Sequence, residues 1–149
     1  MRVFQAPQHL CPSETPAIFL AGSIELGFAV DWQQTVVEYF RELPVTLYNP
    51  RRRDWDSTWT LRADDPQFFE QVTWELEALR RSDLVIMNLL PGTLSPISLL
   101  ELGLFASSGK LRVCCPEDFQ RAGNVEIVCQ QYGIPLYRTL LELLASLPF

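Results

Sequence analysis

The stretch Asp83–Leu89 has the sequence DLVIMNL, in which apolar residues form an almost unbroken run. A short run of this kind predicts a strand that is buried on both faces, as in the middle of a parallel sheet. Ser95-Pro96 then places a capping residue before a proline, so we expect a helix to Ser107 that Gly109 closes. The stretch therefore predicts a strand followed by a crossover helix, the repeating unit of parallel sheets.

The rest of the chain alternates between strand and helix patterns in the same way. Asp65-Pro66 repeats the signal of a cap and a proline, which predicts a helix over residues 66–81. The other expected strands are Ala17–Ala21, Val45–Tyr48, Leu111–Cys115 and Ile134–Tyr137, and the other expected helices are Trp32–Leu43, Asn124–Tyr132 and a last helix that Thr139 and Glu142 cap. This alternation predicts an α/β fold, a flavodoxin-like or Rossmann-like three-layer sandwich with a five-stranded parallel sheet and helices on both faces.

The length of 149 residues is typical of one domain, and the chain has no internal repeat or low-complexity tract. We expect residues 17–149 to form this domain. Residues 1–16 contain Pro7, Pro12 and Pro16, and we expect them to form a loose N-terminal arm.

The composition argues against several classes of function. A net charge of −6, from 12 basic and 18 acidic residues, is unsuited to binding a nucleic-acid polymer or an anionic membrane by bulk charge. His9 is the only histidine and no two cysteines form a C-x-x-C pair, so we expect neither a metal site nor a histidine-dependent triad. No signal-peptide pattern is visible, and no apolar run reaches the roughly 18–20 residues of a membrane helix, so the expected location is cytoplasmic.

Ligands of such sheets bind beyond the carboxyl ends of the strands, at the point where the strand order reverses. That rule points to three segments of this chain, Gly22–Ile24, Asn49–Arg53 and Leu90–Glu101. In the first, Gly22 and Ser23 offer backbone N–H groups and a hydroxyl to an anion, although many strands simply end in glycine. In the third, Ser95 is either only a helix cap or a phosphate ligand beside free helical N–H groups.

The segment after the second expected strand is basic and aromatic. Asn49-Pro50 ends the strand, and Arg51 begins a run of three arginines, either a solvated loop or a clamp for phosphate or carboxylate. Trp55 and Trp59 follow in a polar loop, where they either stack on a base or cover the core. The motifs G-x-x-x-x-G-K-[ST], G-x-G-x-x-G and G-x-S-x-G are missing, which removes the ordinary NTPase, dinucleotide-binding and α/β-hydrolase interpretations.

Glu101 is the only charged side chain between Asp83 and Lys110. Its expected neighbours on the helix surface are Ile97, Leu104 and Phe105. An unpaired carboxylate on such a surface would cost several kcal/mol or become protonated. An active site near the helix N-terminus would compensate for that cost, and so would a salt bridge to an arginine at the edge of the packed face. Spacing alone does not separate the two interpretations.

Glu75 is the second acidic candidate. In the helix over residues 66–81, the apolar stripe is formed by Phe68, Phe69, Val72, Leu76 and Leu79. Glu75 projects at the border of this stripe, whereas Glu70 and Glu77 project to the far side. Glu75 is therefore placed either to reach a cleft or to pair with Arg80 or Arg81 at the surface.

Taken together, these positions resemble the nucleoside 2-deoxyribosyltransferase superfamily, from Ile18 to about Tyr132. Four segments carry the resemblance. Ile18–Ile24 resembles the family's opening strand and glycine turn, and Trp74-Glu75-Leu76 ahead of Ser82-Asp83-Leu84 resembles its acidic helix before the third strand. Leu100–Gly103 resembles its E-L-G nucleophile helix, and Gly123-Asn124-Val125 resembles a segment that reaches a neighbouring subunit's site. The combination is more specific than any single segment.

The resemblance implies roles for the two acids. Glu101 would be the nucleophile that attacks the anomeric carbon and forms a glycosyl-enzyme ester, with retention over two displacements. Glu75 stands where the family has an acidic residue that hydrogen-bonds the base and helps to protonate the leaving nitrogen. Asn124 would complete a neighbour's site, which implies a homo-oligomer. No metal or organic cofactor is implied.

Two positions depart from the transferase pattern. Phe19 stands where the transferases carry a tyrosine that orients the nucleophile, so that contact is missing or replaced. Ser95 stands where they have an aspartate that holds the sugar. The related deoxynucleoside 5′-monophosphate N-hydrolases have a serine there for the phosphate, and their turn resembles Gly22-Ser23-Ile24. A serine at a helix N-terminus would accept a phosphate, whereas an aspartate would repel it.

The sequence thus predicts an enzyme that cleaves or exchanges the N-glycosidic bond of a nucleoside, with Glu101 and Glu75 as catalytic residues. The expected substrate-binding residues are Phe19, Gly22, Ser23, Asn49, Arg51, Ser95 and Asn124. A hydrolase of nucleoside 5′-monophosphates is the nearest alternative. Alternatives of another class are a nucleotide sensor without turnover and an oligomerisation domain with an ion-paired Glu101. The expected partners are a small nucleoside or nucleotide and further copies of the chain, with no nucleic-acid polymer and no membrane.

Overall fold

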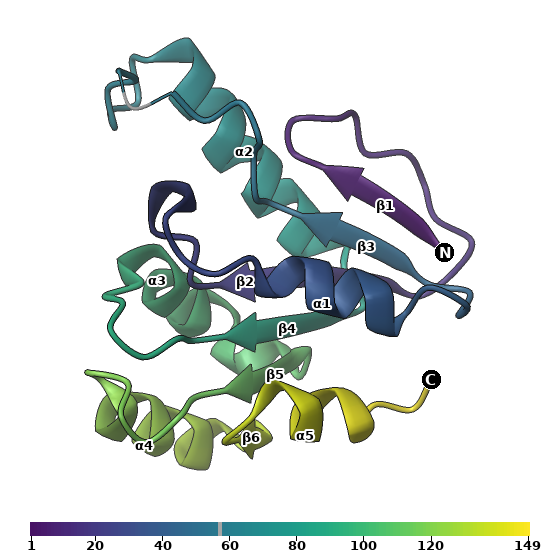
Figure 1. Ribbon diagram of the computed structural model, residues 1–149, viewed down its shortest axis with the longest axis vertical. Helices are drawn as coiled ribbons and strands as arrows, with labels where there is room; N and C mark the ends of the chain where they lie inside the picture. The colour runs from purple at the N-terminus through teal and green to yellow at the C-terminus, as the bar shows by residue number, and fades with distance from the viewer. Residues whose placement is uncertain (57) are drawn as a thin grey trace.

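A sheet of six parallel strands runs through the middle of the computed structural model, which describes residues 1–56 and 58–149 (Figure 1). The strands are β1 (Arg2–Gln5), β2 (Ala17–Gly22), β3 (Thr46–Asn49), β4 (Leu84–Asn88), β5 (Leu111–Cys114) and β6 (Leu136–Tyr137). Their order across the sheet is β1-β3-β2-β4-β5-β6. Without the edge strand β1, this is the order of flavodoxin-like folds, so the expected α/β class is confirmed.

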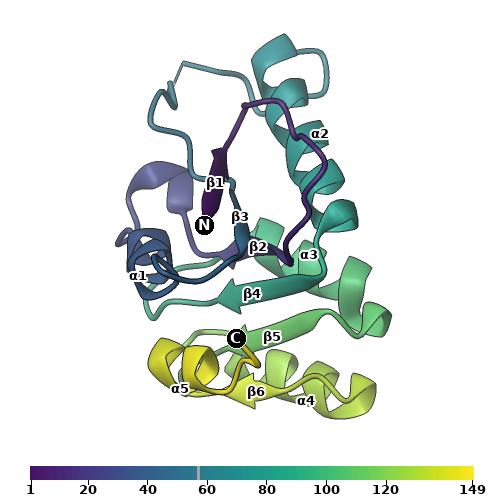
Figure 2. The ribbon, with the colours of Figure 1, turned by 90° about the vertical axis from the view of Figure 1, so that its right-hand side faces the viewer.

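Helices cover both faces of the sheet. α1 (Trp32–Tyr39) and α5 (Leu140–Ala145) lie on one face, and α2 (Pro66–Arg81), α3 (Pro96–Phe105) and α4 (Ala122–Tyr132) lie on the other (Figure 2). Two short 3₁₀ helices, η1 (Glu25–Gly27) and η2 (Ala106–Ser108), follow β2 and α3. In the part of the chain that the structure describes, no helix has the length and apolar character needed to span a bilayer.

The expected helix ends are largely confirmed. The Asp65 carboxylate accepts hydrogen bonds from the backbone N–H groups of Gln67 and Phe68, and Thr139 and Glu142 form the expected capping box. α1 ends at Tyr39 instead of Leu43, and α3 passes into η2 at Phe105 before Gly109 ends the segment in a left-handed conformation. The capping residues of α2 and α5 therefore work as the sequence indicated.

The sheet has six strands instead of the five expected, and the additional strand lies in the segment predicted to be a loose arm. β1 pairs with β3 from Arg2 opposite Thr46 to Gln5 opposite Asn49. Beyond it, the indole N–H of Trp74 donates to the Gln8 carbonyl at 2.7 Å, and Arg81 donates to the Leu10 carbonyl at 2.8 Å. An edge strand needs only one partner, so β1 forms without the apolar run that marks β2 and β4.

The core is divided between the two faces of the sheet because successive side chains of a strand point to opposite sides. On β2, Phe19 and Ala21 pack toward α2, α3 and α4, and Ile18 and Leu20 pack toward α1 and α5. All five residues of β4 are buried, as the DLVIMNL pattern predicted. Both central strands are thus fixed from two sides.

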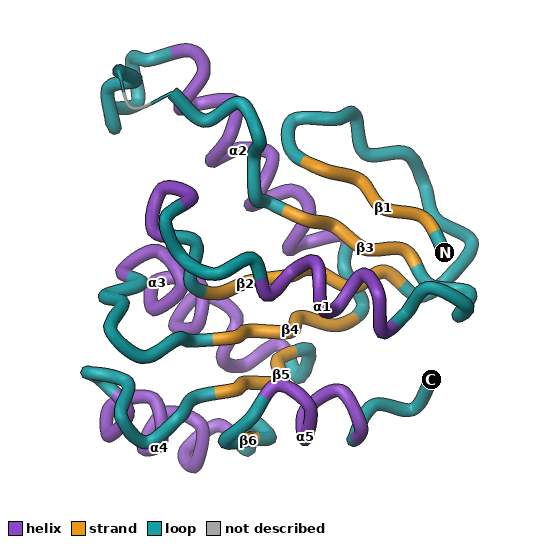
Figure 3. The backbone as a smooth tube through the Cα atoms, in the orientation of Figure 1, coloured by secondary structure: helices purple, strands orange, loops and turns teal. Residues whose placement is uncertain are grey.

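The strand order reverses between β2 and β4, and the two strands meet very closely at their carboxyl ends. Gly22 lies opposite Asn88 with a φ of 136°, in a region that favours glycine. A Cβ atom at position 22 would overlap the Asn88 carbonyl, and the Ser23 N–H donates to that same carbonyl at 2.9 Å. The loops after β2 and β4 therefore start from neighbouring points on one edge of the sheet (Figure 3).

We expect Gly22→Ala to lower the free energy of unfolding by about 3 kcal/mol, because the new methyl group meets fixed backbone and the φ angle is unfavourable for alanine. Gly103→Ala is the matched control, since a Cβ there meets open space on an exposed turn of α3 and alanine favours helix. Urea denaturation of both variants measures the difference. Equal stabilities would contradict the close approach of the two strands.

Candidate active site

Glu101 lies on the buried face of α3, and only 7% of its surface is exposed. The other buried residues of this helix are Ser98 and Leu102, whereas Ile97, Leu100 and Leu104 are more than half exposed. α3 thus buries a carboxyl group beside Leu102 and leaves three large apolar side chains outward, where an ordinary surface helix places polar residues. Within residues 1–56 and 58–149, the Glu101 carboxyl group has no salt bridge and no hydrogen bond.

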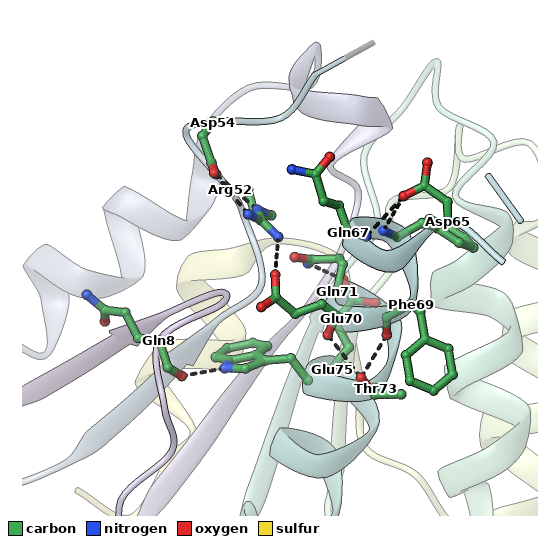
Figure 4. Close-up of polar contacts among 12 residues, drawn as sticks. Gln8, Arg52, Asp54, Asp65, Gln67, Phe69, Glu70, Gln71, Thr73 and Glu75 are labelled. Carbon is green, nitrogen blue, oxygen red and sulfur yellow. Dashed lines mark hydrogen bonds and ion pairs between the residues drawn. The ribbon is translucent and has the colours of Figure 1, made fainter. Parts of the chain in front are cut away.

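Glu75 lies on α2 and accepts a hydrogen bond from the amide of Gln71, one turn earlier, at 2.8 Å (Figure 4). The same amide nitrogen donates to the Pro50 carbonyl at 2.9 Å, which joins α2 to the end of β3. The buried face of α2 contains Gln71, Trp74, Ala78 and Leu79, so it is rotated from the stripe expected around Phe69, which is exposed. This rotation carries Glu75 toward the interior.

The two acids influence each other. Burial and, to a smaller extent, the nearby charge of Glu75 together raise the pKa of Glu101 to about 8. Burial also raises the pKa of Glu75 to about 7, against the opposing effect of the Gln71 hydrogen bond. Both directions follow from removing a carboxylate from water without supplying a cation. Both carboxyl groups therefore keep a proton to higher pH than an exposed glutamate does.

The arginines that were alternative partners of these acids are bonded elsewhere. Arg80 and Arg81 both pair with Glu77 on the outer side of α2, at 3.7 and 2.7 Å. No ion pair to Glu75 or Glu101 occurs among the residues that the structure describes. The described residues therefore do not support the alternative that Glu101 forms a structural salt bridge with an arginine.

A cluster of hydroxyl groups lies where the loops after β2 and β4 meet. The Ser23 Oγ lies 2.6 Å from the Ser95 Oγ and 2.9 Å from the Thr93 Oγ1. The Leu90 N–H donates to the Ser23 Oγ at 2.9 Å. Ser23 and Ser95 are both buried, so this cluster ties the glycine turn to the start of α3.

Ser95 occupies the N-cap position of α3, but its hydroxyl accepts no hydrogen bond from the first turn of the helix. The expectation that its side chain caps the helix was therefore wrong. Its φ of 46° is left-handed, and the side chain turns toward Ser23. Its backbone N–H donates to the Glu25 carboxylate at 2.8 Å. The Glu25 carboxylate of η1 thus accepts a hydrogen bond at the amino end of α3.

Asn49 and Arg51 organise a loop instead of extending into open solvent. The Asn49 side chain accepts a hydrogen bond from the Arg51 N–H at 3.0 Å. The Arg51 guanidinium donates to the Gly27 and Ala29 carbonyls at 2.9 and 2.7 Å, and it lies 3.7 Å from Asp31. Arg51 therefore fixes the segment that contains η1.

Arg52 has a similar structural role. It pairs with Asp54 at 2.9 Å and with Glu70 at 3.3 Å, as Figure 4 shows, and its guanidinium lies 4.7 Å from the centre of the Trp59 ring. The Trp55 and Trp59 rings lie 5.0 Å apart. The first two arginines of the run thus order the polar loop, and the two tryptophans pack on each other.

A surface cavity of about 510 Å³ lies beside this loop, and Asn49 and Arg51 are among its lining residues together with Asp31 and Trp55. Neither Glu75 nor Glu101 lines it. Asn49 and Arg51 therefore line a cavity that neither acid lines, although Gln71 links Glu75 to the Pro50 carbonyl between them.

The two remaining candidates differ in their exposure to solvent. Phe19 has no exposed surface and is part of the core, so in this structure it offers nothing that a sugar could touch. Asn124 is exposed in the first turn of α4. Within the described residues, no three His, Cys, Asp or Glu side chains are grouped to hold a metal ion.

Four polar residues of this region were missed by the sequence analysis: Glu25, Gln71, Thr93 and Ser98. Gln71 precedes Glu75 by one helical turn, a spacing that brings two side chains together and could have been noticed. Ser98 lies three residues from both Ser95 and Glu101 on the buried side of α3, which is also a readable spacing. Glu25 and Thr93 had no comparable signal, because loop conformation places them.

One comparison with known proteins identifies the family of this chain. A family model described as "Nucleoside 2-deoxyribosyltransferase like" matches residues 15–119. The chain belongs to this family. The matched segment runs from β2 to beyond β5 and contains both acids of the pair, whereas Asn124 lies outside it. A comparison with curated proteins gave no match.

We expect Glu101→Gln to stabilise the protein more at pH 8.5 than at pH 5. The pKa of Glu101 in the folded protein is raised above the ordinary value of 4.5, so the folded state binds this proton more tightly than the unfolded state does. The free energy of unfolding that the bound proton contributes is lost as the pH rises through about 8. One pKa unit corresponds to about 1.4 kcal/mol, so we expect a gain on the order of 3 kcal/mol at pH 8.5.

Denaturant unfolding of the variant and the parent protein at both pH values tests this expectation. Glu77→Gln is the control, because Glu77 is exposed on the same helix as Glu75 and the pKa of its carboxyl group is lowered by Arg81. Its effect is not expected to grow with pH in this range. An effect of Glu101→Gln that is the same at both pH values would contradict a buried, unpaired carboxyl group.

Proposed function

We propose that this protein cleaves or exchanges the N-glycosidic bond of a nucleoside, with Glu101 as the nucleophile and Glu75 as the acid that assists the leaving base. The observation that carries the proposal is a pair of carboxyl groups with raised pKa values, a buried Glu101 and a half-buried Glu75 whose charge contributes to the raised pKa of Glu101. Pairs of this kind mark sites that combine acid catalysis with nucleophilic attack at a sugar. Membership in the nucleoside 2-deoxyribosyltransferase-like family supports a nucleoside as the substrate.

The first step breaks the bond to the base. A carboxylate oxygen of Glu101 attacks the anomeric carbon on the face opposite the base, and a covalent ester forms. The bond from this carbon to the base nitrogen breaks, its electron pair stays on the nitrogen, and Glu75 supplies the proton that neutralises the departing base.

The second step releases the enzyme. A ring nitrogen of an incoming base, or a water molecule, attacks the anomeric carbon and displaces the Glu101 carboxylate. Glu75, now ionised, takes the proton that the incoming group loses. Each displacement inverts the configuration, so the product keeps the configuration of the substrate.

The first step needs the two acids in different protonation states. Attack requires a charged Glu101, and departure of the base requires a protonated Glu75, so the reactive form contains one proton on the pair. The sugar develops positive charge as the bond breaks, and a carboxylate in a poorly hydrated place stabilises that charge more than it would in water. The burial that raises the pKa of Glu101 thus also increases its effect on the transition state.

A nucleotide sensor without turnover is the second candidate. The observation in its favour is that the Glu101 carboxyl group lacks an orienting hydrogen bond within the described residues, and Phe19 has no hydroxyl to provide one. Tight binding of intact compounds without release of free base would favour this candidate over the enzyme.

We expect Glu101→Gln to lower base release by at least about 10³-fold, because a neutral amide cannot form the ester, and Glu75→Gln to lower it by about 10²-fold. Chromatography of the four deoxynucleosides and their 5′-monophosphates, with and without an acceptor base, measures release and exchange. Glu77→Gln is the control and should retain activity, because its side chain is exposed and paired with Arg81. Undiminished base release by folded Glu101→Gln protein would refute the mechanism.

The proposal includes assembly of the chain into a homo-oligomer. Leu94, Ile97, Leu100 and Leu104 are each more than half exposed along α3 and the residues before it. Ile127 on α4 and Phe69 on α2 are exposed to a similar extent, and these helices cover the same face of the sheet (Figure 2). Exposed apolar residues of this number on one face are typical of a surface that is covered in an assembly.

We expect Leu100→Lys to shift the protein toward the 17.1 kDa monomer, because a buried lysine would lose its hydration at the interface. Leu141→Lys is the control, since Leu141 is equally exposed but lies on α5, on the opposite face of the sheet. Sedimentation velocity of the parent chain and of both variants measures the masses. A parent protein that is already monomeric at micromolar concentration would contradict the assembly.

A further inference from the structure

Gln71 is a buried side chain of α2 whose amide orientation is fixed by its neighbours. Its Nε2 atom donates one hydrogen to the Pro50 carbonyl at 2.9 Å and the other to the Glu75 Oε1 at 2.8 Å (Figure 4). A carbonyl oxygen accepts hydrogen bonds and cannot donate them, so the nitrogen of the amide must face Pro50. The reversed orientation would place the amide oxygen against the Pro50 carbonyl oxygen. The end of β3 therefore makes Gln71 a donor to Glu75.

This orientation leaves the amide oxygen of Gln71 without a donor. The Gln71 Oε1 is buried and has no hydrogen-bond partner in the part of the chain that the structure describes. A buried acceptor without a donor lowers the stability of a fold, and an apolar side chain of similar size would avoid this cost. The glutamine at this position therefore calls for an explanation besides stability, and a role at Glu75 supplies one.

The hydrogen bond from Gln71 makes the two carboxyl oxygens of Glu75 different. In a protonated carboxyl group, one oxygen carries the proton and the other, the carbonyl oxygen, is the better acceptor. Because the Gln71 amide donates to Oε1, a proton on Glu75 is more stable on Oε2. The amide is itself fixed by the backbone at Pro50, so this preference does not depend on a side chain that is free to rotate.

We propose that Gln71 is a positioning residue that holds the Glu75 Oε1 as the carbonyl oxygen and thereby assigns the transferred proton to Oε2, an inference that rests on the proposed function. In the first step the bond from Oε2 to its proton breaks, the proton passes to the leaving nitrogen, and the electron pair stays on Oε2. In the second step Oε2 takes the proton that the incoming base or water loses. Gln71 accepts and gives up no proton in either step.

The same hydrogen bond also affects how readily Glu75 gives up its proton. Burial raises the pKa of Glu75 to about 7, against the opposing effect of the Gln71 hydrogen bond. Glu101 on α3 is the other acid that interacts with Glu75. β2 and β3, whose side chains pack against α2, carry no charged residue. The remaining titratable groups beside α2 are paired or exposed: Glu70 and Glu77 pair with arginines, and His9 is exposed.

Nuclear magnetic resonance of isotopically labelled protein tests this inference without turnover. A Glu101→Gln background is used so that the two acids do not titrate together, and the carboxyl signal of Glu75 is assigned by its loss in Glu75→Gln. We expect Gln71→Met, which keeps the length of the side chain and removes the donor, to raise the pKa of Glu75 by about one pH unit. Gln67→Met is the matched control and should leave this pKa unchanged, because Gln67 is exposed one turn earlier on α2.

The pH dependence of base release gives a second measurement, with Glu101 intact. Base release falls at high pH when Glu75 loses the proton that the first step needs. We expect Gln71→Met to move this alkaline limb toward higher pH, and Gln67→Met to leave it in place. A residue with a structural role alone would lower the rate without moving the limb.

If Gln71→Met unfolds the chain, the protein with Gln71 intact still decides. The amide hydrogen that faces Glu75 should shift downfield as Glu75 ionises, because a bond to a carboxylate is stronger, whereas the hydrogen that faces Pro50 should not. An amide signal that does not respond to Glu75 overturns the inference, and so does a pKa of Glu75 that Gln71→Met leaves unchanged. Failure of the proposed function has a different signature, since the parent protein would then release no base while the pKa of Glu75 still responded to Gln71.

Discussion

Two carboxyl groups, the buried one of Glu101 and the half-buried one of Glu75, interact without a cation from the described residues to pair with either of them. Burial favours the neutral form of each group, so an ionised Glu101 is less stable here than in water. A fold retains such an arrangement when the surrounding structure is stable enough to tolerate it. Here β2 and β4 are apolar on both faces, and the core beneath the pair is complete. On the proposed function, the stability lost at Glu101 and its reactivity have one physical cause, the burial of its carboxyl group.

The strand order determines which loops can approach the pair. β2 and β4 are neighbours although α1, β3 and α2 separate them in the sequence, so the segments after Gly22 and Asn88 begin at one edge. The lack of a side chain at Gly22 permits this close approach. The Ser23 and Ser95 hydroxyls then come within 2.6 Å of each other at the start of α3. A constraint on backbone packing thus creates the polar end of the candidate site.

Local signals made much of this predictable. The DLVIMNL run identified β4, the Asp65-Pro66 pair identified the start of α2, and the isolation of Glu101 in an apolar segment pointed to the site. The edge strand β1 gave no such signal, because its sequence RVFQ lacks an apolar run and needs only β3 as a partner. The contact of Glu25 with Ser95 depends on left-handed backbone at both residues, which no residue pattern indicates.

α3 buries polar side chains and exposes large apolar ones, and this distribution is explained if both faces of the helix have a function. Ser98 and Glu101 occupy the inward face, where a helix on a sheet ordinarily places its large apolar residues, and Ile97, Leu100 and Leu104 point outward. Burying apolar surface stabilises a protein, so covering these three side chains against a second copy would offset part of the stability that Ser98 and Glu101 forgo on the inward face. On the proposed assembly, the neighbouring copy stabilises the outer face and thereby allows the inner face to stay polar. Assembly and the reactivity of Glu101 are then two properties of a single helix.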